Sequence, residues 1–128
     1  MKTIMTTILI TGATSGIGEA LAKLAAQSGH QVIACGRNED KLAELEKLPC
    51  IQTCKFDVTN EAETKKALAD VTCDIAVLNA GTCEYVDLPE LEPDMFKRVF
   101  DANVFGVVNM IAGLLPKLEK GNKIVFVD

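Results

Sequence analysis

The sequence predicts an α/β protein in which a parallel sheet lies between two layers of helices. Short apolar runs, typical of strands buried on both faces, alternate with segments whose apolar residues recur at the helical period. A glycine-rich stretch, 11–18, joins the first run to the first helical segment. Right-handed crossovers then predict a three-layer, doubly wound sheet with strand order 3-2-1-4-5.

Five strands are expected, each a short apolar run. Their ranges are 7–10, 31–35, 51–56, 74–78 and 123–127. Because the sequence stops at 128, directly after the fifth run, we expect a fold truncated after its fifth strand. The whole sequence, 1–128, is expected to form one domain, since it has no linker and no internal repeat.

Four helices are expected between these strands. The first begins at Gly16, directly after the glycine-rich stretch. Asn38 is expected to cap the second helix, and Thr59 or Asn60 the third, because short polar side chains accept a hydrogen bond from the first helical turn. Pro93 opens the fourth, which is long and apolar along one stripe.

Composition argues against two classes of partner. The net charge is −5, and the chain has no basic stripe with interleaved aromatic residues, so no nucleic-acid partner is expected. Polar residues interrupt the apolar runs well short of the about 20 residues that a membrane helix needs. We therefore expect no membrane association and a cytoplasmic location.

The five cysteines are expected to be reduced thiols, because the number is odd and no C-x-x-C pattern occurs. The alternative is that Cys50 and Cys54 form half of a metal site. Zinc needs four converging ligands, and the single histidine, His30, lies across a different turn. No metal site is expected, and His30 is interpreted as a solvated turn residue.

The stretch 11–18 reads T-G-A-T-S-G-I-G and is expected to bind phosphate. Gly12 permits a tight turn, Gly16 lets the backbone approach a pyrophosphate, and Gly18 lets the helix pack closely on the strand. The residues of the loop and helix start that would surround the phosphate also include Thr14, Ser15 and Ile17. A tight strand-to-helix turn without a ligand is the alternative.

Four features of the chain occur together in the order and spacing of one family. They are T-G-x-x-x-G-x-G at 11–18, Asp57-Val58 after the third strand, Asn79-Ala80-Gly81 after the fourth, and Asn103 in the long helix. On these residues the whole chain resembles the short-chain dehydrogenase/reductase family. It is similar to the N-terminal, cofactor-binding half of a member of roughly 250 residues with a Rossmann-type fold.

The resemblance implies a role for each feature. Asp57 with Val58 would contact the adenine, and Asn79-Ala80-Gly81 would form the floor beneath the adenosine ribose. Asn103 would be a catalytic residue, at a helix distortion where its amide orders a water beside the catalytic Lys. The residues alone leave alternatives open, since the first two also fit ordinary turns and Asn103 also fits an amide satisfied within the core.

The end of the second strand bears on the choice of cofactor. A carboxylate there, about 20 residues after the glycine loop, would bind the ribose hydroxyls of NAD. This sequence instead has Gly36-Arg37-Asn38, and a guanidinium can bind a 2′-phosphate bidentately. We therefore expect NADP(H) as the cofactor. A solvated surface cation is the alternative for Arg37.

The resembled family also uses a Tyr-x-x-x-Lys pair and a Ser, which this sequence lacks; four residues after Tyr85 comes Pro89. The expected function is the cofactor-binding half of an NADP(H)-dependent oxidoreductase acting on an unknown carbonyl or alcohol, inactive alone. The alternatives are a non-catalytic NADP(H)-binding sensor or interaction module, and a remnant that binds nothing. Strand 123–127 and helix 94–118 would lack covering neighbours, so self-association through them is expected.

Overall fold

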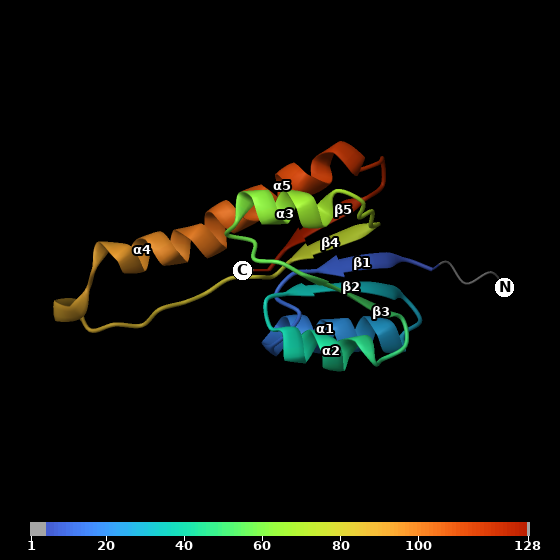
Figure 1. The fold of residues 1–128 in the computed structure, drawn as a ribbon, viewed down its shortest axis with the longest axis horizontal. Helices are drawn as coiled ribbons and strands as arrows, with labels where there is room; N and C mark the ends of the chain where they lie inside the picture. Colours follow the sequence, from blue (N-terminus) through green and yellow to red (C-terminus); the bar gives the residue numbers. More distant parts are fainter. Residues whose placement is uncertain (1–4, 128) are drawn as a thin grey trace.

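A computed structural model describes residues 5–127 and shows an α/β fold of three layers (Figure 1). The strands are β1 (Thr7–Ile10), β2 (Gln31–Gly36), β3 (Ile51–Lys55), β4 (Ile75–Leu78) and β5 (Lys123–Phe126). All pairings are parallel, and the order is β3-β2-β1-β4-β5. The predicted fold class and strand order are confirmed.

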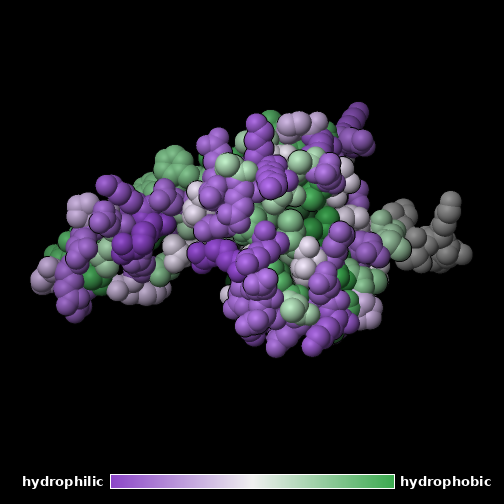
Figure 2. Space-filling model, in the orientation of Figure 1, coloured by the Kyte–Doolittle hydropathy of each residue, from purple (hydrophilic) through white to green (hydrophobic). Residues whose placement is uncertain are grey.

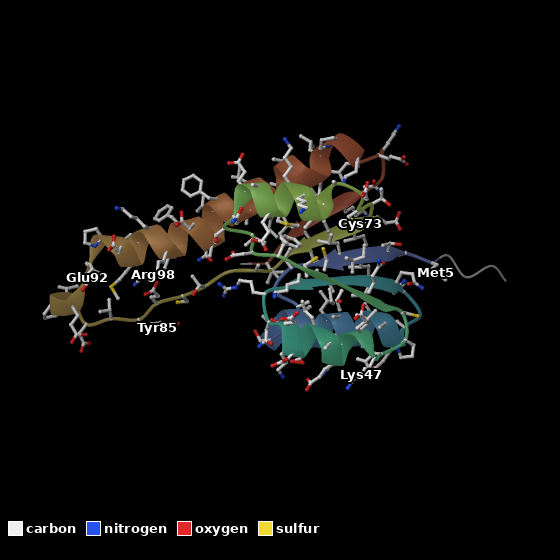
Figure 3. All side chains as sticks on the ribbon, viewed as in Figure 1. Met5, Lys47, Cys73, Tyr85, Glu92 and Arg98 are labelled. Carbon is white, nitrogen blue, oxygen red and sulfur yellow. The ribbon has the colours of Figure 1, made fainter. Side chains whose placement is uncertain are left out.

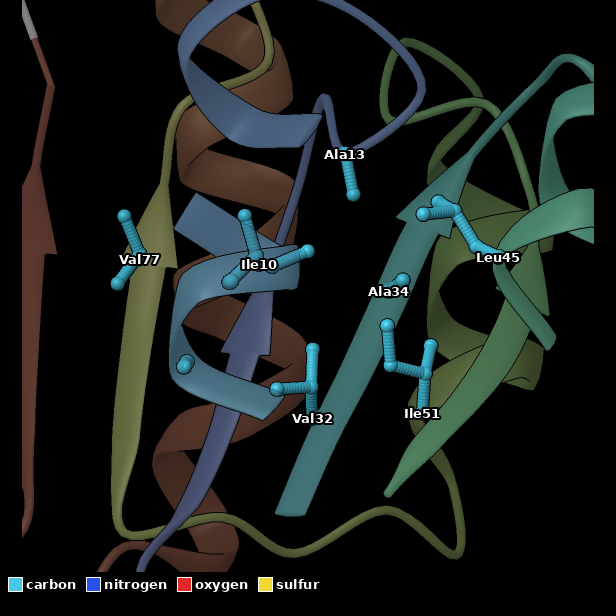
Figure 4. Close-up of a cluster of buried hydrophobic side chains, with 9 residues drawn as sticks. Ile10, Ala13, Val32, Ala34, Leu45, Ile51 and Val77 are labelled. Carbon is cyan, nitrogen blue, oxygen red and sulfur yellow. The ribbon is translucent and has the colours of Figure 1, made fainter. Parts of the chain in front are cut away.

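Helices cover both faces of the sheet. α1 (Gly16–Gln27) and α2 (Glu39–Glu46) lie on one face, and α3 (Glu61–Leu68) and α5 (Gly106–Leu114) lie on the other (Figure 1). Each face buries its own hydrophobic cluster, and Figure 4 shows the one that contains Ile10. Leu9 and Ile10, neighbours in β1, are both 0% exposed, because successive strand residues point to opposite faces. β1 is therefore the buried centre of the fold.

The predicted long helix is present but irregular. The long helix begins with α4 (Pro93–Phe100), after the short turn η1 (Leu88–Glu90). It continues through the π-helical segment η2 (Asp101–Phe105) into α5 and ends with the turn η3 (Leu115–Lys117). α4 projects beyond the layered body (Figure 1). The fold therefore consists of a layered body and a projecting arm, which is helix α4 (Pro93–Phe100).

Helix caps and element ends follow the predictions with small differences. Asn38 caps α2 as predicted, and Asn60, rather than Thr59, caps α3. β3 ends at Lys55, one residue before the predicted end, although the next amide still donates to a carbonyl of β2 at 3.1 Å. These differences of about one residue leave the order of the elements and the layers unchanged.

The irregular helix meets a simple criterion for membrane spans. Pro93–Lys117 has 25 residues, and an 18-residue window within it has a mean hydropathy of 1.5, with 17% of that window buried. Core helices of soluble proteins meet the same criterion, and here Met110 and Leu114 pack against the sheet. The apolar stretch is longer than the sequence analysis assumed, and the expected lack of membrane association stays a prediction.

The arm and the edge strand β5 expose large apolar side chains. On the arm and its continuation, the exposed fractions are 53% for Phe96, 51% for Phe100 and 56% for Phe105. On β5, Val125 is 43% exposed and Phe126 60% exposed. Figure 2 shows hydrophobic side chains on the arm among a largely hydrophilic surface. The apolar edge and helix face expected from the sequence are therefore present.

Candidate dinucleotide site

The side chain of Thr11 joins the carboxyl ends of β1 and β4. Its hydroxyl oxygen accepts the backbone amides of Asn79 and Ala80, both at 2.9 Å. The Asn79 side chain donates in turn to the carbonyl of Gly12 at 3.3 Å. Because Thr11 is only 2% exposed, its hydrogen bonds are shielded from water. These hydrogen bonds connect the glycine loop to Asn79-Ala80-Gly81 at the carboxyl edge of the sheet.

The glycine loop has the backbone geometry that the motif requires. Gly12 and Gly16 have φ values of 65° and 56°, a region that favours glycine. A Cβ on Gly18 would lie 2.1 Å from the carbonyl oxygen of Gly12, so glycine is needed for α1 to approach β1 this closely. A Cβ on Gly16 would meet nothing within 4 Å, which leaves the backbone there open to a ligand.

The start of α1 is suited to an anion. Ser15 occupies the N-cap position, but its side chain makes no capping hydrogen bond. The N–H groups of the first turn have no partner within an α-helix, and the helix dipole adds positive potential at the same end. This end of α1 therefore offers a phosphate both hydrogen-bond donors and a favourable field.

A cavity of about 860 Å³ opens beside the loop, where the carboxyl ends of β1 to β4 converge. The predicted cofactor residues in its wall are Gly12, Thr14, Ser15, Gly36, Arg37, Asn38, Asp57, Val58, Ala80 and Gly81. Four predicted residues, Gly16, Ile17, Gly18 and Asn79, are not part of this wall. The topology thus brings together most of the predicted set from four separate segments.

The end of β2 forms one side of this first cavity. A Cβ on Gly36 would lie 2.6 Å from Cγ2 of Thr14, so Gly36 lets the glycine loop pack against β2. The Arg37 side chain is 77% exposed, and its Nη1 lies 3.9 Å from Oδ2 of Asp57. An ion pair this long and exposed is weak. The guanidinium is therefore available to an anionic ligand at the cavity rim.

Asp57 uses its two carboxylate oxygens differently. Oδ1 accepts the amide of Thr59 at 2.9 Å and its hydroxyl at 2.8 Å, which is the turn role considered from the sequence. Oδ2 faces Arg37 in the cavity wall. The turn role and a ligand-contacting role are therefore compatible.

Asn103 lies in the π-helical segment, at the helix distortion that the family resemblance implied. Its side chain is exposed, so the alternative of an amide buried in the core is wrong. Oδ1 accepts the Thr82 amide at 2.7 Å, and Nδ2 donates to the Thr82 carbonyl at 2.8 Å. A Cβ on Gly81 would lie 2.7 Å from Oδ1, so Gly81 makes room for this contact. Asn103 thus fastens the loop after β4 to the long helix.

A bidentate ion pair also connects the loop after β4 to helix α4. Arg98 of α4 donates from Nε and Nη2 to the two carboxylate oxygens of Glu84, at 2.9 and 2.7 Å. Figure 3 shows Arg98 on α4, facing the loop that carries Tyr85. Hydrogen bonding to Arg98 lowers the pKa of Glu84, and the carboxylate raises the pKa of Arg98. The pair orients the arm relative to the loop.

A second cavity, of about 1030 Å³, adjoins the first. Ala80, Gly81, Thr82 and Glu84 line both cavities. The second also includes Ile17, Asn79 and Asn103 of the predicted residues, together with apolar side chains of α4 and β5. The predicted site residues therefore follow a continuous path from the end of β2 to the long helix.

Several residues of this region were not among those predicted from the sequence. They are Lys41, Thr82, Glu84 and Arg98, all in the wall of the first cavity. The sequence could have indicated Lys41, because it lies in the first turn of α2. The cap of that helix, Asn38, was predicted to lie beside Arg37. The contacts of Glu84 with Arg98 had no such signal, because they join segments whose spacing in the fold the sequence does not reveal.

Tyr85, His30 and the possible metal ligands were each considered outside the predicted site. Tyr85 is 93% exposed, and a hydrogen bond with Cys83 raises its pKa, the opposite of what a phenol acting as a base requires. His30 is half-buried rather than solvated, with Nδ1 unpartnered. Among the described residues, no cluster of three or more His, Cys, Asp or Glu side chains could hold a metal.

Known proteins are similar to this chain in sequence and fold. A family model for short chain dehydrogenases matches residues 6–128. Serine 3-dehydrogenase of Rhizobium radiobacter is 38% identical over 127 residues, covering 93% of this chain and 51% of the relative. NADP-dependent 3-hydroxy acid dehydrogenase YdfG of Escherichia coli is 32% identical, covering 90% and 50%. The closed form of serine dehydrogenase complexed with NADP⁺ has a TM-score of 0.85 at 31% identity, covering 94% and 52%.

The fold and the cavities at the carboxyl edge of its sheet define a dinucleotide-binding α/β protein. With the sequence match, the chain belongs to the short-chain dehydrogenase family of oxidoreductases, which bind nicotinamide dinucleotides. The residues present fit such a cofactor, because the backbone at Gly16 is open and the start of α1 is uncapped. The chain spans about half the length of the curated relatives it matches.

Proposed function

We propose that residues 1–128 form one NAD(P)-binding domain, the cofactor-binding half of an NADP(H)-dependent oxidoreductase that acts on a carbonyl/alcohol pair. The choice of NADP(H) rests on the residues that follow the end of β2. Arg37 and Lys41 line the first cavity there, and no carboxylate stands at the position that would bind the ribose hydroxyls of NAD. Two relatives whose names or titles mention NADP support the same choice.

The proposal assigns the bound cofactor to the two cavities. Arg37 and Asn38 hold the 2′-phosphate, Asp57 and Val58 contact the adenine, and the glycine loop holds the pyrophosphate. Ala80 and Gly81, which line both cavities, lie under the middle of the cofactor. The cofactor supplies or accepts a hydride, and Asn103 holds the loop beside the second cavity in place.

The 128 residues alone are proposed to be inactive. Reduction of a carbonyl needs a proton donor beside the reacting oxygen. The sequence has no Tyr-x-x-x-Lys pair, and its single tyrosine, Tyr85, is exposed on the loop. Cytoplasmic location is part of the proposal, since the cysteines are free thiols.

Replacing Arg37 with alanine tests the cofactor assignment. We expect NADPH affinity to fall by about 10- to 100-fold, because charge-assisted hydrogen bonds to a phosphate are lost. NADH affinity should stay within about twofold of its original value, since NADH has no 2′-phosphate. The measurement is titration of cofactor fluorescence. Lys47→Ala, which removes an exposed cation at the far end of α2 (Figure 3), is the control and should leave both affinities unchanged.

An equal loss for both cofactors, or a wild-type preference for NADH, would contradict the NADP(H) assignment. A non-catalytic NADP(H)-binding module is the second candidate, and the exposed apolar face of α4 and β5 favours it. Reading the gene beyond codon 128 separates the two, since a downstream Tyr-x-x-x-Lys supports the oxidoreductase. Turnover by the purified 128-residue chain would contradict the proposed inactivity.

Self-association through strand 123–127 and helix 94–118 is also proposed. We expect the isolated chain to sediment as a dimer or larger species at micromolar concentration, because an open apolar edge strand pairs readily. Phe126→Lys, which places a charge on that edge, should shift the protein toward monomer. Leu24→Lys on α1 is a matched control, since Leu24 is 61% exposed and Phe126 60%. A stable wild-type monomer, or equal effects of the two variants, would count against this interface.

A further inference from the structure

We propose that Cys54 and Cys35 form a peroxide-oxidised thiol pair whose disulfide weakens binding in the first cavity. The two cysteines are direct register partners on the adjacent parallel strands β2 and β3. Side chains in register on neighbouring strands point to the same face of the sheet. Both belong to the hydrophobic cluster on the α3 and α5 side, Cys35 buried and Cys54 partly buried.

The strand geometry brings the pair within bridging range. Neighbouring strands lie about 4.8 Å apart, and disulfides join Cα atoms about 4.4–6.8 Å apart. The Cys54 sulfur lies 4.0 Å from the carbonyl oxygen of Ala67 on α3, and the Cys35 sulfur lies 3.8 Å from the carbonyl of Ile33. The pair is therefore enclosed between the sheet and α3, with Cys54 on the more accessible edge strand.

The two sulfurs are chemically unequal. A hydrogen bond from Cys35 lowers the pKa of Cys54 to about 7, although partial burial opposes this. The same hydrogen bond, together with burial, raises the pKa of Cys35 well above its ordinary value. Cys54 is the attacking thiolate, because it is the more exposed of the two sulfurs, lies on the edge strand and has the lower pKa. Cys35 is the resolving thiol.

The oxidant is hydrogen peroxide. The Cys54 thiolate attacks one peroxide oxygen, the O–O bond breaks, and a sulfenic acid forms while hydroxide leaves. The hydroxide takes up the proton that the Cys54 thiol released on ionising, which gives the first water. The Cys35 sulfur then attacks the Cys54 sulfur, the S–O bond breaks, and a second water leaves. Two thiols lose two electrons and two protons in total, and one peroxide becomes two waters. A thiol reductant reverses the change.

Cys35 connects this chemistry to the cavity. It lines the first cavity, and its carbonyl oxygen accepts the amide of Ala13 in the glycine loop at 3.1 Å. Forming the disulfide draws the Cys35 side chain toward β3 and disturbs that hydrogen bond. We expect NADPH affinity to fall by about fivefold, the loss of roughly one such bond. This last step rests on the proposed function, whereas the thiol chemistry does not.

The test uses the 128-residue chain with one equivalent of hydrogen peroxide. Peptide mapping should show a Cys35–Cys54 disulfide and the loss of two free thiols, reversed by dithiothreitol. Cys54→Ser and Cys35→Ala should each abolish it, and Cys50→Ser, four residues from Cys54 and outside both cavities, should not. A disulfide involving Cys50, Cys73 or Cys83, or no disulfide at all, would overturn the pairing.

Cofactor titration of the reduced and oxidised protein separates the two proposals. Weaker NADPH binding after oxidation, restored by dithiothreitol and absent in Cys54→Ser, supports the full proposal. Unchanged affinity in protein with a mapped Cys35–Cys54 bond overturns the link to the cavity. Failure of the reduced protein to bind NADPH contradicts the proposed function, while the mapped disulfide still decides the thiol pairing.

Discussion

Replacing Gly18 with alanine is expected to destabilise the chain by about 3 kcal/mol and to abolish NADPH binding. The new Cβ would lie 2.1 Å from the carbonyl oxygen of Gly12 and 2.7 Å from Nδ2 of Asn79. The first contact is with backbone, which cannot rotate away, so α1 must move off β1. Urea unfolding measures the free energy of unfolding, and cofactor fluorescence measures binding.

Gly16→Ala is the matched control for this prediction. Gly16 also lies at the start of α1, but a Cβ there meets nothing within 4 Å. Its cost should be only about 1–2 kcal/mol, from the positive φ of 56°. Where a helix position has free space, replacing glycine with alanine stabilises the helix by about 1 kcal/mol. A loss of stability in Gly18→Ala is therefore due to the clash of its Cβ with the Gly12 carbonyl. Equal or smaller destabilisation by Gly18→Ala would contradict the close-packing role.

The sequence predicted those features that depend on local signals. Strand order followed from alternating apolar runs and the handedness of crossovers, and it agrees with the structure. Asn38 was predicted as a cap because its oxygen needs only the amide of Lys41, three residues on, at 3.1 Å. The glycine loop was predictable for the same reason, since the turn and the helix start lie within one short stretch.

Contacts between distant segments were not predictable. Counting along a regular helix leads to the alternative of a core amide for Asn103, whereas residues 101–105 are π-helical, at the distortion that the family resemblance implied. A π turn closes with an i→i+5 bond, so it rotates the following residues away from the expected face. The Asn103 amide instead meets the backbone of Thr82, 21 residues earlier. Phe96 and Phe100 are exposed because α4 extends past the sheet, which agrees with the uncovered helix face expected from the sequence.

Thr11→Val is expected to lower the free energy of unfolding by about 3 kcal/mol. Valine matches threonine in shape, but it cannot accept the amides of Asn79 and Ala80, which Thr11 holds at 2.9 Å. Leaving a buried donor unsatisfied costs about 1–3 kcal/mol, and here two donors lose their acceptor at once. NADPH binding should also weaken, because this hydroxyl joins the glycine loop to the segment that lines both cavities.

Thr11→Ser separates the hydroxyl from the packing. Serine keeps the accepting oxygen and loses one buried methyl group, so the expected cost is only about 1 kcal/mol. Binding of NADPH should be retained in the serine variant. Hydrogen exchange at the Asn79 and Ala80 amides provides an independent measurement, since both should exchange faster in Thr11→Val and remain protected in Thr11→Ser. If serine and valine prove equally destabilising, the methyl group and not the shared oxygen stabilises this edge of the sheet.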